Sequence, residues 1–86
     1  MDMKTFAEIQ FADAEFKVDI VDNNGDNIES FRLPDATHYA NTHPDAGVAA
    51  WLSEAAIEAK PLLRDVDYVL RGDFKVDGDS ARAELK

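Results

Sequence analysis

One short polar segment has the ligand types of a calcium-binding loop. Asp22, Asn24 and Asp26 alternate as the oxygen ligands do at the start of an EF-hand loop. An EF-hand also needs Gly at its sixth position and Glu at its twelfth, where this chain has Asn27 and Leu33. Asn, Asp and Gly are equally the residues of a tight turn between strands. We therefore predict a polar hairpin turn here and no bound cofactor.

The two histidines are the other candidate metal ligands. His38 and His43 stand five residues apart, close to Asp35 and Asp45. Carboxylates at this distance could complete a site, but histidine pairs that bind zinc from a helix stand four apart and share a third ligand. We predict neutral loop histidines and no metal site.

Nothing in the chain has the pattern of a catalytic nucleophile. No serine lies in a G-x-S-x-G elbow, and no glycine-rich loop precedes a helix. The tripeptide Arg71-Gly72-Asp73 matches a cell-adhesion motif, but it lies within a predicted strand and we interpret it as a chance match. We expect no catalytic residues and no enzymatic activity.

Charge is the most unusual property of the chain. Eighteen acidic residues, twelve of them Asp, oppose nine basic ones and give a net charge of −9. Such a charge repels nucleic acid and anionic membranes and attracts basic surfaces. We therefore expect a protein partner with a basic surface, with no direct contact to nucleic acid or membrane.

The acids also predict rows of fixed charge. Residues i and i+2 of a strand share one face at about 6.6–6.8 Å, and residues i and i+4 continue the row. Three pairs would form such rows and are the predicted partner-binding acids: Glu15 and Asp19, Asp65 and Asp67, Asp73 and Asp77. Such rows could imitate the phosphate backbone of DNA and occupy a nucleic-acid channel lined by Lys and Arg. Interleaved bases such as Lys17, Arg71 and Lys75 would weaken this imitation.

The first half of the chain reads as three strands. Apolar residues alternate with polar ones over residues 5–11 and again over residues 15–20, as in strands with one buried face. Residues 12–14 read as a short connection and residues 22–27 as a turn. A third strand is predicted over residues 28–33 and ends at Pro34, and residues 35–44 are predicted to be irregular.

A helix is predicted to begin at Thr42 and to end at Lys60. Thr42 would be the N-cap, with Pro44 in the first turn, and Pro61 would stop the helix. Its apolar stripe predicts that Trp51 anchors the core between helix and sheet. Ile57 lies opposite that stripe with Ala50 beside it, and is the predicted apolar contact for a second chain.

Two interpretations compete after Pro61. The leucines and valines of residues 62–70 fit a second short helix, while residues 66–76 alternate between apolar and charged side chains with one exception. The longer alternation favours one strand over residues 66–76, paired through a turn at residues 77–79 with a last strand over residues 81–85.

The predicted fold is therefore a single α+β domain spanning residues 1–86. Its element order is β-β-β-α-β-β, an antiparallel sheet of about five strands with one helix packed across one face. No apolar run approaches the roughly 18–20 residues of a membrane span, and residues 1–6 lack the basic and apolar regions of a signal peptide. We expect a cytoplasmic protein.

These properties favour an interaction domain. We expect an inhibitor or decoy that binds a basic, nucleic-acid-processing protein. In size and charge the chain is similar to phage-encoded inhibitors of CRISPR or restriction systems, a likeness of type that no motif carries. The alternative is a structural or assembly protein, such as a phage particle accessory or a homodimeric adaptor, that uses the Ile57 helix face and the sheet edges. A calcium- or metal-binding module ranks third.

Overall fold

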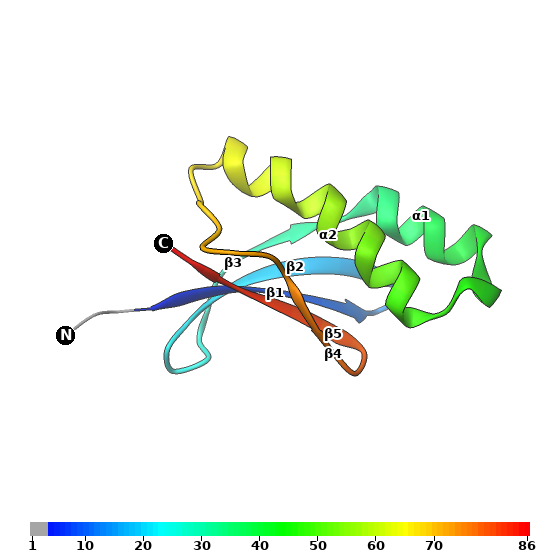
Figure 1. The fold of residues 1–86 in the computed structure, drawn as a ribbon, viewed down its shortest axis with the longest axis horizontal. Coiled ribbons are helices and arrows are strands. Elements are labelled where there is room, and N and C mark those ends of the chain that lie inside the picture. The colour runs from blue at the N-terminus through cyan, green and yellow to red at the C-terminus, as the bar shows by residue number, and fades with distance from the viewer. Residues whose placement is uncertain (1–3) are drawn as a thin grey trace.

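Five antiparallel strands form one sheet, and two helices cover one of its faces in a computed structural model that describes residues 4–86 (Figure 1). The strands are β1 (Thr5–Ala12), β2 (Glu15–Asp22), β3 (Asn27–Arg32), β4 (Lys75–Asp77) and β5 (Ser80–Leu85), in the sheet order β3-β2-β1-β5-β4. The helices are α1 (Pro34–Thr42) and α2 (Val48–Asp65), joined by the short 3-10 helix η1 (Pro44–Ala46). The predicted α+β class and five-stranded antiparallel sheet are confirmed, with a second helix that was not predicted. Residues 1–3, which belong to the segment predicted not to be a signal peptide, lie outside the described residues.

Strands β1 and β2 follow the predicted alternation. The side chains of Ile9 and Val18 are fully buried under the helices, whereas Phe11, predicted to lie on the same buried face, is 45% exposed at the end of β1. The predicted short connection is a two-residue hairpin, because Ala12 pairs with Glu15. Both residues between them, Asp13 and Ala14, have positive φ, as the central residues of a type I′ turn do.

The polar segment that resembles a calcium-binding loop, residues 22–27, is a turn stabilised by the side chain of its first residue, Asp22. The Asp22 carboxylate accepts hydrogen bonds from the backbone N–H groups of Asn24 (2.9 Å) and Asp26 (3.0 Å). It leads into β3, the edge strand beside β2, where a bulge lies at Ile28. The predicted polar hairpin turn is confirmed.

Helix α1 replaces the irregular segment predicted between residues 35 and 44. Pro34 ends β3 as predicted, but it also occupies the first helical turn, where its missing N–H costs nothing. Ala36 and Ala40 stand four residues apart and are both buried against the core. The prediction of an irregular segment was therefore wrong. The helix was missed because two alanines make an apolar stripe too short to indicate a helix from sequence alone.

Helix α2 begins six residues later than predicted. Thr42 closes α1 rather than opening α2, because its hydroxyl donates to the His38 carbonyl at 2.9 Å. Pro44 starts the 3-10 turn η1, and α2 begins after Gly47, which has a φ of 94°. A positive φ of this size is accessible mainly to glycine. The Thr42 N-cap prediction was therefore wrong.

Helix α2 also continues past Pro61, where it was predicted to stop. Pro61 has no N–H to donate to the Ile57 carbonyl. Both residues lie on the solvent side of the helix, so water can bond to that carbonyl instead. Beyond Pro61, Leu63 is completely buried on the same stripe as Ala55 and Ala59. Burial of Leu63 offsets the cost of the proline.

The single strand predicted over residues 66–76 is absent. Helix α2 ends in a Schellman motif: Asp67 has a φ of 68°, the Asp67 N–H donates to Arg64 and the Tyr68 N–H donates to Leu63. Only an isolated bridge between Leu70 and Leu85 precedes β4, which has three residues. The predicted pairing with β5 and the turn after Asp77 are confirmed for these three residues alone.

The core lies between the helices and the covered face of the sheet. Helix α1 packs on β2, and α2 packs on β1 and β5. Trp51 is only partly buried against this core, and its indole N–H donates to the His43 carbonyl at 2.9 Å. The indole thus joins α2 to the segment after α1, as well as contributing to the core that it was predicted to anchor.

Candidate functional site

The predicted acidic row on β2 exists, but its carboxylates are already occupied. Glu15 accepts two hydrogen bonds from the Arg32 guanidinium, at 2.8 and 3.0 Å, and lies 3.6 Å from Lys17. Asp19 accepts hydrogen bonds from Gln10 and Ser30, both at 2.7 Å. A basic partner would have to displace these contacts.

The pKa of Glu15 reflects this pairing. The hydrogen bond from Arg32 lowers the pKa of Glu15 below its usual value, burial acts in the opposite direction, and the nearby charges of Arg32 and Lys17 lower it further. Glu15 therefore takes up a proton at a lower pH in the folded protein than in the unfolded chain. Its negative charge is largely offset by its two basic neighbours.

Asp65 and Asp67 do not form a strand row. Asp65 is the last residue of α2, and Asp67 lies in the turn that ends the helix. Both side chains are exposed, and neither has a basic side chain within 4.0 Å among residues 4–86. These two acids remain available to a partner, although not in the predicted geometry.

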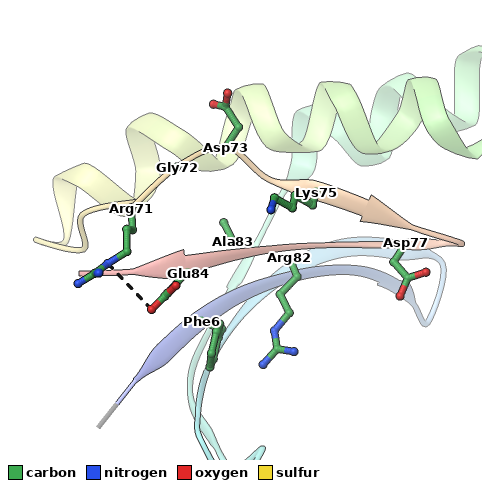
Figure 2. A pocket seen from close by; sticks show the side chains of 9 residues that line it. All are labelled: Phe6, Arg71, Gly72, Asp73, Lys75, Asp77, Arg82, Ala83 and Glu84. Carbon is green, nitrogen blue, oxygen red and sulfur yellow. Dashed lines mark ion pairs between the residues drawn. The ribbon is translucent and has the colours of Figure 1, made fainter. Parts of the chain in front are cut away.

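Asp73 and Asp77 likewise do not act as one row. The Asp73 carboxylate lies 3.1 Å from the Lys60 ammonium of α2, while its side chain stays 89% exposed. Asp77 stands at the β4–β5 turn with no such partner among the described residues. Figure 2 shows Asp73 directed toward α2 and Asp77 at the other end of β4.

Most of the negative charge lies in turns and at the ends of elements. Of the seventeen acidic residues at positions 4–86, four are in ion pairs with basic side chains and thirteen are not. Nine of the thirteen lie in turns or at element ends: Asp13, Asp22, Asp26, Asp35, Asp45, Asp65, Asp67, Asp77 and Asp79. The open sheet face, by contrast, carries four acids paired with bases or amides: Glu8, Glu15, Asp19 and Glu84.

Ile57 is as exposed as its position on the helical wheel predicts. Its side chain is 64% exposed on the solvent side of α2, more than any other large apolar residue among those described. Ala50, its predicted neighbour, is half-buried. Glu54 is exposed on the same side of the helix. The Ile57 face is thus a small apolar spot with an acid beside it.

A hollow beside β4 was not predicted from the sequence. Residues 72–74 leave the sheet edge between the Leu70–Leu85 bridge and the Lys75–Arg82 pair, and the space they leave has a volume of about 480 Å³ (Figure 2). Its lining combines three bases, three acids and an aromatic ring: Arg71, Lys75, Arg82, Asp73, Asp77, Glu84 and Phe6, with Gly72 and Ala83. The turn at Gly78-Asp79 fixes the register that places Lys75 opposite Arg82, so a correct β4 would have revealed this pair.

The Arg82 guanidinium is held in place at this hollow. It lies 3.3 Å from the Glu8 carboxylate, and its central carbon is 3.9 Å from the centre of the Phe6 ring. This stacking on an aromatic face adds a cation–π attraction. Across the hollow, Arg71 lies 4.0 Å from Glu84, which also pairs with Lys4 at 3.7 Å.

The remaining candidate residues do not converge. His38 lies on α1, so its predicted position in a loop was wrong, and His43 follows that helix with its ring stacked on Tyr39 at 4.4 Å. Among residues 4–86, no three His, Cys, Asp or Glu side chains are grouped to hold a metal ion.

The placement of Arg71-Gly72-Asp73 within a strand was wrong. All three residues are exposed in the segment between α2 and β4. Arg71 and Asp73 nevertheless point in opposite directions, toward Glu84 and toward α2 (Figure 2). A ligand could not readily contact both side chains at once.

Comparisons with known proteins give no relative for this chain: no family model matches it, and neither do curated proteins or solved structures. Within the described part of the chain, neither helix has the length and apolar character needed to span a bilayer.

Proposed function

We propose that this chain is a non-catalytic interaction domain that binds a protein with a basic surface. The observation that carries the proposal is that thirteen acids among residues 4–86 have no basic partner there, most of them in exposed turns and at element ends. Unpaired carboxylates project a field that steers a basic protein toward the chain. We propose that it acts in the cytoplasm as an inhibitor or decoy of a nucleic-acid-processing protein, in the manner of phage-encoded anti-CRISPR or antirestriction proteins.

Two double variants with the same charge change test whether position matters. Asp65→Asn with Asp67→Asn neutralises two unpaired acids, while Glu8→Gln with Glu15→Gln neutralises two acids that already have basic partners. Binding of a poly-lysine probe should weaken severalfold in the first variant, mainly through a slower association rate, and less in the second. Raising salt from about 50 to about 200 mM, which halves the Debye length, should weaken wild-type binding severalfold.

Equal weakening in both variants would contradict the proposal. It would show that the probe responds to net charge alone and that no part of the surface is set apart for binding. Circular dichroism of both variants serves as the control for folding.

The exposed Ile57 favours a second candidate, a structural or adaptor protein that associates through α2. A sheet-edge contact is less favoured, because β3 carries a bulge and the inward-facing Glu29, and β4 has only three residues. If this second function holds, sedimentation should show a dimer that persists at high salt and that Ile57→Lys dissociates. A monomer at all salt concentrations would exclude it.

A further inference from the structure

The pair formed by Lys75 and Arg82 violates a rule of sheet stability. The two residues are direct cross-strand partners, and both are exposed on the open face of the sheet. Directly opposed side chains have Cβ atoms about 4.5–5.5 Å apart, where like charges destabilise the pairing. This occurs in a chain with twice as many acids as bases, so an acid at either position would have been the locally favourable choice.

Neighbouring acids neutralise only one member of this pair. Arg82 is partnered by Glu8 on β1, but Lys75 has no acid within 4.0 Å among residues 4–86. The acids that line the hollow are engaged elsewhere or set apart, Glu84 with Lys4 and Arg71, Asp73 with Lys60, and Asp77 at the β4–β5 turn. A like-charge pair in which Lys75 stays without an acid is a local conflict of the kind found at binding sites.

We propose that this hollow binds a small ligand through an oxyanion group, a carboxylate or a phosphate. Arg82 is preorganised by Phe6 and Glu8 to present its N–H groups, and Lys75 adds a second charge beside it. Arg71, 61% exposed on the opposite rim, is the third donor. The volume of about 480 Å³ accommodates a small molecule rather than an ion alone.

The overall charge of −9 and the nearby acids set the affinity. They repel any anion, so they weaken binding and favour ligands that contact both β4 and β5. This inference does not rest on the proposed function, since a basic partner and a small anion bind different side chains.

The test is an NMR titration of the full chain with inorganic phosphate and, separately, with acetate, at constant pH and ionic strength. Backbone amide signals of Gly72, Lys75 and Arg82 should shift and saturate, while Gly25 in the β2–β3 turn should not move. Tighter binding of one anion than of the other identifies the group that the hollow prefers. Shifts that grow linearly, or that sodium chloride reproduces, would overturn the proposal.

Two substitutions at one position separate binding from stability. Lys75→Gln should weaken phosphate binding at least fivefold. Lys75→Glu should abolish the saturable shifts and yet raise Tm without phosphate, because it replaces a like-charge pair by an ion pair with Arg82. Lys17→Glu makes the same charge change near Glu15 and should leave phosphate binding intact. A wild-type response in Lys75→Glu, or a lower Tm in that variant, would overturn the proposal.

Discussion

The β1–β2–β3 meander and the segment from α1 to β4 are stabilised by contacts of different range. In the meander, each strand pairs with the next one along the chain through a short connection. In the second segment, the first turn of α1 is capped by Glu58 of α2, which accepts the N–H groups of Asp35 (3.0 Å) and Ala36 (2.8 Å) from 22 or more residues away. Tyr68, after α2, donates its hydroxyl to Glu29 of β3, 39 residues away.

This difference shows which elements can form from local contacts and which need another element to be in place. The meander can begin to form from its own hairpins, since the closing contacts are local. The N-terminal N–H groups of α1 have no side-chain cap of their own, because Leu33 occupies the N-cap position. Helix α1 is therefore stable only once α2 is in place, and the end of α2 is fixed by its contacts with the sheet.

The largest expected effect comes from the end of α2. Leu63 is fully buried two residues beyond Pro61, so Leu63→Ala should lower the free energy of unfolding by about 2–5 kcal/mol. Urea denaturation measures this loss. Ile57→Ala on the exposed side of the same helix is the control and should change stability by less than about 0.5 kcal/mol. Similar small effects for both would mean that the helix does not pack beyond Pro61.

Removing the cap supplied by Glu58 should have the next largest effect. Glu58→Ala leaves two N–H groups of α1 without their acceptor and should cost about 0.5–2 kcal/mol. Faster hydrogen exchange confined to α1 would locate the loss in that helix. Glu54→Ala, one turn earlier on α2 and exposed, is the matched control. If both variants unfold at the same urea concentration, the cap does not stabilise α1.

One residue with positive φ in the meander, and one in the segment from α1 to β4, can each be replaced by glycine and the two changes in stability compared. Ala14 in the β1–β2 turn has a φ of 63°, which costs alanine about 1 kcal/mol, so Ala14→Gly should raise stability by up to that amount. Asp67→Gly at the end of α2 should raise it less, since Asp tolerates this conformation better than Ala. Thermal unfolding of both variants tests the order. A loss of stability in Ala14→Gly would contradict the assigned turn.

The smallest expected effect is a pH dependence in the meander. The pKa of Glu15 is lower in the folded protein than in the unfolded chain, because Arg32 bonds to its ionised form. Its contribution is therefore present above the unfolded value of 4.5 and is lost as pH falls below it toward the folded pKa. Glu15→Gln should flatten the loss of stability below pH 4.5. An unchanged profile would show that the Arg32 contact does not persist in solution.

The elements whose contacts are local could be predicted from the amino-acid sequence. Alternation over β1, β2 and β5 identified the buried faces, because side chains of a strand alternate strictly between two faces. The polar turn after Asp22 and the exposure of Ile57 followed from residue type and helical spacing in the same way. Net charge followed from composition, but composition does not say which carboxylates have partners.

Where two local patterns were possible, long-range packing selected one of them. Residues 62–65 could extend a helix past Pro61, and residues 66–76 could alternate as a strand. The helix continued because Leu63 reaches the core in line with Ala55 and Ala59, and the alternation after it became three residues of β4. The same packing decided the candidate site: it paired Glu15 and Asp73 with bases, left Asp65 and Asp67 unpaired, and placed Lys75 opposite Arg82. The pairing of Glu15 and Asp73 depends on residues far apart in the sequence, whereas the Lys75–Arg82 pair follows from a local hairpin once β4 is known.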